Sequence, residues 1–408
     1  MTLKLLDGLR ERLRKAAVQK AASIVVPNPQ AISDTIQRAF ASAGLDTQAG
    51  PMKDVSDTIE QALSAAGLRQ SGSGENRAAA GRAASGHRDN VIEGVAQRVP
   101  KQDACTPAAG KPMTPDASAQ GEFGNHTFTN HAGTRTYKLY VPSNDARAPD
   151  KPAPLVVMLH GCTQSADDFA AGTRMNTLAE KHGFLVVYPA QAANANGSKC
   201  WNWFRAEDQA RDRGEPAIIA GITRDVASKH RVDEQRIFVA GLSAGAAMSV
   251  ILGATHPELY AAVGAHSGLA YGAAHDMPSA FGAMQGGSAP RPLAQHAVAT
   301  IVFHGDGDRT VDAKNGAAIV KQALAGRPDA ARLHSTVQTG KSSGGRGYHR
   351  TVHADAAGHP VVEEWVLHGG AHAWSGGSAA GSFTDGAGPD ASAEMVRFFL
   401  SQPIAGTA

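Results

Sequence analysis

Continuous apolar runs recur from about residue 121 onward and alternate with segments that suit helices. Runs such as PLVVMLHG at 154–161 and FLVVYP at 184–189 show no polar alternation. Such runs are typical of parallel strands that are buried on both faces. Strands separated by helices predict an α/β fold, with a mostly parallel central sheet flanked by helices. The pattern predicts strands at 154–161, 184–189, 236–241, 261–266, 299–305 and 360–369, two antiparallel strands within 128–142, and helices over 165–182 and 215–229.

The first 120 residues have a different composition. They are rich in Ala, Gly, Ser, Gln and Arg, and their only aromatic residue is one Phe. A segment of this kind buries too little apolar surface to offset its conformational entropy. We therefore expect a largely disordered N-terminal tail with short helices over 1–120, followed by a folded domain over 121–403.

The tail contains an internal duplication. ISDTIQRAFASAGL at 32–45 recurs as VSDTIEQALSAAGL at 55–68. Each copy has a Ser-Asp pair that can cap a helix, apolar residues at i, i+4 and i+8, and a Gly-Leu pair where the helix would end. Helices this short are marginal alone in water, so their apolar faces need a cover. A leftover hairpin without a partner is the alternative interpretation.

Composition and charge narrow the classes of function. The formal net charge of +2 gives no basis for nucleic-acid binding. No stretch reaches the roughly 18 apolar residues of a membrane helix. Three cysteines without a C-x-x-C pair, and no H-E-x-x-H spacing, indicate neither a metal site nor another cofactor. The N-terminus has no apolar run of secretory length, which favours a cytoplasmic protein.

The sharpest chemical signal is GLSAG at 241–245. It directly follows the apolar strand RIFVA and precedes the Ala-rich segment AAMSVILGAT. In this strand–turn–helix context a serine nucleophile sits on a strained turn, and small neighbours let the backbone approach. The motif predicts Ser243 as the nucleophile of an α/β-hydrolase fold. A glycine-rich turn with a capping serine is the alternative.

A serine hydroxyl needs a base, and the base needs an orienting carboxylate. In this fold the order along the chain is Ser, acid, His. The loop after ATIVFHG offers Asp306, Asp308 and Asp312. We choose Asp308 because it lies at the crest of the loop, and turn or helix capping accounts for the other two. After the last predicted strand, His372 lies in a glycine-rich loop, whereas His368 still belongs to the strand.

An oxyanion intermediate needs two N–H donors. In this fold the residue after the nucleophile, here Ala244, supplies one, and the loop after the third strand supplies the other. That loop is HGCTQ at 160–164. We choose the Cys162 N–H, with Thr163 as the second choice. The alternative is that HGCTQ is only a tight turn.

These motifs are part of a longer resemblance. Over residues 121–400 the chain resembles the polyhydroxybutyrate depolymerase family of esterases, relatives of the feruloyl and acetylxylan esterases. The matching stretches are LHGCTQSADDFA, YPAQ, CWNWF, GEPAIIAGI, VAGLSAGAAM, HSGLAYGAA, FHGDGDRTV and GGAHAWSGG. The resemblance implies a triad of Ser243, Asp308 and His372, and it supports Cys162 as an oxyanion donor.

The resemblance also implies a substrate class, namely carboxylic esters or polyesters. Secreted polymer-degrading members carry a signal peptide and a C-terminal substrate-binding domain, and this sequence displays neither. Soluble oligomers, amorphous polyester or small acyl esters are therefore the expected substrates. Family members are often extracellular, so the resemblance and the N-terminus favour different compartments. The tail helices at 32–45 and 55–68 are candidates for docking on a polyester granule or a protein.

Three rival functions stay open beside hydrolysis of hydroxybutyrate esters. A feruloyl or acetylxylan esterase would take aromatic or sugar esters. An acyltransferase would use the same triad with an alcohol as acceptor. A non-catalytic binding protein on a hydrolase scaffold is the third rival, and the intact Ser/Asp/His set argues against it.

Two further groups of side chains lie near these motifs. Cys162 and Cys200 fall in loops expected at the same end of the sheet. They either form a disulfide, in oxidising surroundings, or stay free thiols, as in a reducing cytoplasm. Four aromatic residues either line an acyl cleft or pack in the ordinary way: Trp201, Trp203, Tyr271 and Trp374.

Overall fold

The computed structural model describes residues 121–143, 151–287, 291–293 and 297–402. The tail predicted over 1–120, with its helices at 32–45 and 55–68, lies outside these residues, and its docking role stays a prediction. Among the described residues, no helix combines the length and the apolar character that crossing a bilayer requires.

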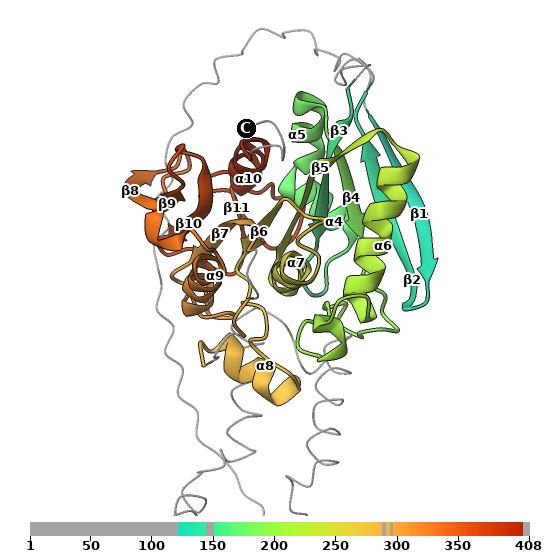
Figure 1. Ribbon diagram of the computed structural model, residues 1–408, viewed down its shortest axis with the longest axis horizontal. Helices are drawn as coiled ribbons and strands as arrows, with labels where there is room; N and C mark the ends of the chain where they lie inside the picture. The colour runs from blue at the N-terminus through green and yellow to red at the C-terminus, as the bar shows by residue number, and fades with distance from the viewer. Residues whose placement is uncertain (1–120, 144–150, 288–290, 294–296, 403–408) are drawn as a thin grey trace, which may run out of the picture. The chain divides into compact units, whose positions relative to one another are not determined.

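One large sheet organises the described domain (Figure 1). Its strands are β1 (Glu122–Asn130), β2 (Gly133–Val141), β3 (Ala153–Leu159), β4 (Leu185–Pro189), β5 (Val232–Leu242), β6 (Ala262–His266), β7 (Ala299–Gly305), β8 (His334–Lys341), β9 (Gly347–Ala354) and β10 (Pro360–Leu367). They lie in the order β1-β2-β4-β3-β5-β6-β7-β10-β9-β8. The pairing is parallel from β4 to β10. Antiparallel strands form both margins, with β2 beside β4 and β9 beside β10.

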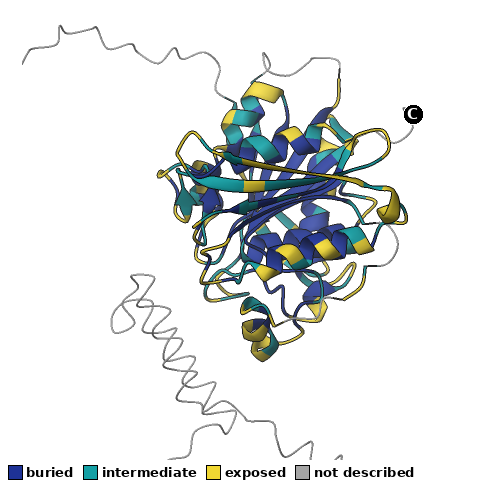
Figure 2. Cartoon of the chain, turned by 90° about the vertical axis from the view of Figure 1, so that its left-hand side faces the viewer, coloured by how far each residue is buried: buried dark blue, intermediate teal, exposed yellow. Residues whose placement is uncertain are grey.

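Helices cover both faces of the sheet, as the layers in Figure 2 show. One face carries α6 (Gly214–Lys229), α7 (Ala244–Thr255) and α9 (Lys314–Ala325). The other carries α4 (Ala166–Thr173), α5 (Met175–His182) and α10 (Ala391–Leu400). The remaining elements are α8 (Met277–Met284), the short 3-10 helices η1 (Glu207–Gln209) and η2 (Ala330–Arg332), and a small parallel pair, β11 (Trp374–Ser375) with β12 (Thr384–Asp385).

The apolar core is divided by the sheet into two clusters. Along β3, Leu155, Val157 and Leu159 belong to the cluster beneath α6, α7 and α9. Val156 and Met158 belong to the cluster beneath α4, α5 and α10. Successive side chains of a strand point to opposite faces. Because both faces are covered here, every position of β3 is apolar.

The predicted central strands all occur, with ends that differ by a few residues. The single helix expected over 165–182 is wrong, because it is two helices, α4 and α5, separated by Arg174. Arg174 adopts a left-handed backbone conformation with φ of 54°. Its guanidinium donates to the Gly376 carbonyl oxygen (2.8 Å) and to Asp390 (2.9 Å). These two contacts stabilise the break.

The strands β8 and β9 were not predicted from the apolar pattern. β8 has the sequence HSTVQTGK, and nearly all of its residues are exposed. An edge strand without a buried face lacks the apolar periodicity by which a strand is recognised. The β8–β9 hairpin, which extends the sheet beyond β10, therefore could not be predicted from the apolar pattern of the sequence.

Candidate active site

Ser243 lies on the sharp turn between β5 and α7. Its φ of 57° and ψ of −120° fall in a region that is costly for a residue with a side chain. The Ser243 N–H donates to the His266 carbonyl oxygen (2.9 Å) at the end of β6. A Cβ atom on Gly245 would lie 2.1 Å from the Leu159 carbonyl oxygen. The turn is thus pressed against the end of β3, and only glycine fits at position 245.

The loop 160–164, which continues from β3, lies beside Ser243. A Cβ atom built on Gly161 would be 3.6 Å from the Ser243 Cβ, which is ordinary van der Waals contact. The Gly161 N–H donates to Gln164 Oε1 (2.9 Å), and Gln164 Nε2 donates to Asp168 Oδ2 (2.8 Å). Gln164 therefore braces the loop from within, a role that the sequence analysis did not identify.

The predicted N–H donors differ in what they bind. The Thr163 N–H donates to the Ser198 carbonyl oxygen (2.7 Å), so the second choice is already engaged. Among the described residues, the Cys162 N–H has no hydrogen-bond acceptor. Ala244 is the first residue of α7, where an N–H has no partner within the helix. The N–H groups of Cys162 and Ala244 are therefore free to bind an anion.

Asp308 and His372, predicted as acid and base, are hydrogen-bonded to each other. His372 Nδ1 donates to Asp308 Oδ2 (2.6 Å), and the Asp308 side chain is fully buried. Asp308 Oδ1 accepts from the backbone N–H groups of Thr310 (2.8 Å) and Val311 (2.9 Å). Donation from Nδ1 leaves Nε2 as the basic nitrogen of a neutral His372.

The surroundings of Asp308 keep its carboxyl group ionised. Burial acts to raise the pKa of Asp308, but the nearby His304 and the hydrogen bond from His372 outweigh it. Together with the charge of His372 and the Val311 N–H, they hold that pKa well below its usual range. His304, whose Nε2 lies 3.5 Å from Asp308 Oδ2, was not singled out in the sequence. An ionised carboxylate orients an imidazole and stabilises its protonated form.

The loops that carry Asp308 and His372 are joined at their bases. The Gly307 N–H donates to the Gly370 carbonyl oxygen (3.1 Å). A Cβ atom on Gly305 would lie 2.1 Å from that same oxygen, so side chains would keep the loops apart. Asp306 Oδ2 accepts from His368 Nδ1 (2.9 Å). Asp306 and His368, the alternatives to the acid and the base, thus brace the junction of the two loops.

His266, at the end of β6, is fully buried. Its Nε2 accepts from the Ser375 N–H (3.0 Å), and its ring stacks on Phe303 and on Trp374. Burial, and then the charges of neighbouring histidines, lower the pKa of His266 to about 3. The ring is therefore neutral at ordinary pH, as its acceptor role toward Ser375 requires.

The aromatic residues expected at an acyl cleft are mostly packing residues. Trp201 and Trp374 are 0% and 1% exposed, so for these two the cleft-lining interpretation is wrong. The Trp201 ring belongs to the apolar core, and its Nε1 donates to the His160 carbonyl oxygen (3.1 Å), so the buried N–H has an acceptor. Trp203 is also buried. Tyr271 is partly exposed and stays a candidate for substrate contact.

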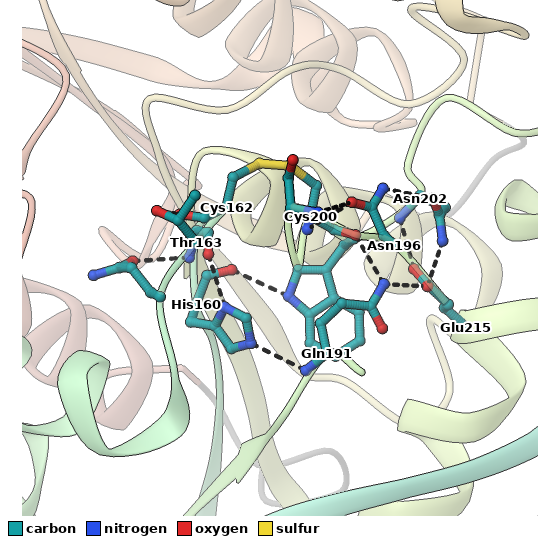
Figure 3. The surroundings of a disulfide bond; sticks show 12 residues. His160, Cys162, Thr163, Gln191, Asn196, Cys200, Asn202 and Glu215 are labelled. Carbon is teal, nitrogen blue, oxygen red and sulfur yellow. Dashed lines mark hydrogen bonds between the residues drawn. A yellow bond between two sulfur atoms is a disulfide. The ribbon is translucent and has the colours of Figure 1, made fainter. Parts of the chain in front are cut away.

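Cys162 and Cys200 form a disulfide, with their Cα atoms 4.2 Å apart (Figure 3). Of the two alternatives left open by the sequence, the structure has the bridge and not the free thiols. The bond ties the loop 160–164 to the long segment between β4 and α6.

Comparison with known proteins matches part of this site to a family. Residues 135–331 match the model of the family described as Esterase PHB depolymerase. This segment belongs to that family. The segment includes Ser243, Asp308 and the loop 160–164, whereas His372 lies beyond its end. The family resemblance inferred from the sequence motifs is confirmed.

Several relatives of this esterase-family domain carry esterase names. The Poly(3-hydroxyalkanoate) depolymerase C of Paucimonas lemoignei is 34% identical over 234 residues, which are 54% of this chain and 55% of the relative. The Acetylxylan esterase A of Talaromyces purpureogenus is 28% identical over 296 residues, covering 62% of this chain and 70% of the relative. The chain thus spans about half the length of the depolymerase.

A solved structure supports the fold of the esterase-family domain. The acetyl xylan esterase from Aspergillus awamori superposes with a TM-score of 0.54 at 21% identity. The match covers 68% of this chain and 99% of that protein. The predicted α/β-hydrolase fold is confirmed.

We predict that Asp308→Asn in this esterase-family domain lowers kcat on a soluble ester by about 10⁴-fold. The new amide would face His372 Nδ1 with an N–H, which forces the imidazole into the wrong tautomer. Asp312→Asn is the matched control, because Asp312 binds the Lys314 N–H and takes no part in the pair. Steady-state kinetics of both variants test this assignment. Equal turnover in the two variants would exclude Asp308 as the orienting acid.

We also predict that the folded domain loses stability as the pH falls from about 6.5 toward 3, in part through His266. In that window His266 is protonated in the unfolded chain but stays neutral in the native state, because its native pKa is about 3. One such proton changes the free energy of unfolding by about 1.4 kcal/mol per pH unit. The free energy of unfolding, measured with urea at pH 7, 6 and 5, should depend less steeply on pH for His266→Gln than for the wild type. Identical slopes would contradict the prediction.

Proposed function

We propose that this protein is a serine hydrolase of carboxylic esters, with Ser243 as nucleophile, His372 as base and Asp308 as orienting acid. The observation that carries the proposal is the hydrogen bond between Asp308 and His372. These residues follow β7 and β10, and Ser243 follows β5. The carboxyl ends of parallel strands lie at one edge of a sheet, so the three residues share that edge.

The proposed reaction is acyl transfer to water. His372 Nε2 takes the proton of Ser243 Oγ while Oγ bonds to the ester carbonyl carbon. The carbonyl electron pair moves to the oxygen, which the N–H groups of Cys162 and Ala244 stabilise. The oxyanion then collapses, the bond to the alcohol breaks, and the alcohol leaves with the proton held by His372. Water, activated by His372, repeats these steps on the acyl-enzyme and releases the acid.

We propose poly- or oligo-(3-hydroxybutyrate), or related short acyl esters, as the substrate class. The family description and the depolymerase name of the Paucimonas lemoignei relative support this choice. An acetylxylan or feruloyl esterase is the second candidate, favoured by the names of other relatives, including a Feruloyl esterase B of Neurospora crassa that is 33% identical over 144 residues. That match covers 35% of this chain and 47% of the relative.

We predict that Ser243→Ala abolishes ester hydrolysis, with a loss of about 10⁶-fold in turnover, because only binding and the N–H donors remain. A fluorophosphonate probe should label Ser243 in the wild type and nothing in the variant. Ser249→Ala, further along α7, is the control, and this variant should still be labelled at Ser243. Labelling of a different serine would reject the assignment of the nucleophile.

We predict that turnover is highest on hydroxybutyrate oligomers and short-chain nitrophenyl esters. The wild-type enzyme should be assayed on these beside amorphous polymer, acetylated xylan and methyl ferulate, each with and without an added alcohol. Higher kcat/KM on the sugar or aromatic esters would favour the second candidate. Transfer of the acyl group to the alcohol in preference to water would identify an acyltransferase, and no turnover on any ester would leave the non-catalytic binding protein.

A further inference from the structure

A buried carboxylate, Glu215, lies behind the loop 160–164 and takes no part in the proposed triad. Glu215 is in the first turn of α6, and its side chain is 4% exposed. Its Oε2 accepts from the Asn202 N–H (2.7 Å), and its Oε1 accepts from Asn202 Nδ2 (2.8 Å) and from Gln191 Nε2. Figure 3 shows these donors converging on the Glu215 side chain.

The charge of Glu215 is matched by donors that the fold supplies locally. Arg135 contributes the cation, with its NH2 3.4 Å from Glu215 Oε1, and its Nε donates to Gln191 Oε1 (3.0 Å). A buried carboxylate is costly unless it is paired and hydrogen-bonded, and removal of its donors or of the charge itself disrupts what surrounds it. The positions of Gln191 and Asn202 are thereby fixed relative to α6.

Three connections lead from these residues to the loop 160–164. The Gln191 N–H donates to His160 Nε2 (3.1 Å). Trp201, adjacent to Asn202, donates from Nε1 to the His160 carbonyl oxygen (3.1 Å). The disulfide joins Cys200 to Cys162. Two hydrogen bonds and one covalent bond therefore connect these residues to the loop that carries the Cys162 N–H. Gln191 is bound by Glu215, Trp201 adjoins Asn202, and the Cys200 carbonyl oxygen accepts from Gln191 Nε2 (2.8 Å).

We propose that Glu215 is a positioning residue, which fixes the Cys162 N–H for the developing oxyanion. This inference rests on the proposed function. An N–H donor stabilises an oxyanion only at the distance and angle that the charged oxygen requires, and the neutral ground state depends on it less. Loss of the Glu215 acceptor should therefore raise the barrier to reaction and leave ground-state binding of the ester nearly unchanged.

The first test is Glu215→Gln in the full chain. The amide would turn an N–H toward the Asn202 or Gln191 donors, in place of an acceptor. We expect kcat on a soluble nitrophenyl ester to fall about 10- to 100-fold while KM changes less than about threefold. Affinity for an alkyl boronic acid, which forms a tetrahedral adduct on a nucleophilic serine, should fall by a similar factor. A kcat within about twofold of the wild type would overturn the proposal.

The matched control is Glu363→Gln. Glu363, in β10, is fully buried and accepts from Arg350 and from Trp365 Nε1, so its replacement removes a comparable buried charge elsewhere in the sheet. It should lower the thermal midpoint and leave kcat unchanged. If both variants lose kcat equally, the effect of Glu215 is general destabilisation and the positioning role is wrong.

A second variant decides the matter if Glu215→Gln does not fold. Trp201→Phe keeps the aromatic packing and the carboxylate network, and removes the Nε1–H donor to His160. It should show the same loss of kcat with KM retained, and a wild-type kcat in this variant would reject the proposed connection. Ser243→Ala distinguishes a failure of the proposed function from a failure of the positioning role. If that variant stays active the proposed function fails, whereas an inactive Ser243→Ala beside a fully active Glu215→Gln rejects the positioning role alone.

Discussion

The close approach of two backbone segments, the end of β3 and the start of α7, is the constraint on which the site depends. Because Gly245 has no side chain, its backbone lies against the carbonyl groups of Leu159 and His160. At this contact Ser243 lies on the turn after β5 with a positive φ of 57°. The same contact brings the loop 160–164 beside the serine. Ser243 and the loop that carries the Cys162 N–H are thus neighbours as a consequence of how two strands end.

Different forces hold the two sides of the site. Around the loop 160–164 the fold uses a disulfide and buried hydrogen bonds, which anchor an irregular segment to α6. Around Asp308 and His372 it uses backbone contact, because Gly305 and Gly370 let two loops meet where side chains would clash. The first arrangement depends on polar side chains that are far apart in the sequence. The second also joins segments that are far apart in the sequence, but where the two loops meet it needs only glycine at the right positions.

This difference explains what the sequence could predict. Ser243, Asp308 and His372 follow apolar runs that identify strands, so local pattern and chain order suffice to find them. Glu215 acts through tertiary contacts, and Gln164 acts through side-chain contacts within its own loop. No periodicity encodes either kind of contact, although both residues fall in stretches that carry the family resemblance. The break of the helix over 165–182 and the burial of the tryptophans likewise depend on partners from distant segments.

Two buried aspartates show how the fold controls charge around the site. Asp308 and Asp208 are 8% and 4% exposed, and burial acts to raise the pKa of each. Asp308 receives hydrogen bonds from His372 and from two backbone N–H groups and lies close to His304, and its pKa falls. Asp208 receives one backbone N–H and faces the negative charge of Glu215, and its pKa rises to about 6. Since burial is similar, the donors and charges directed at each carboxylate decide the sign of the pKa shift. A negative charge is thereby stabilised at Asp308, next to the His372 imidazole, while at Asp208 burial and the charge of Glu215 make the carboxyl group easier to protonate.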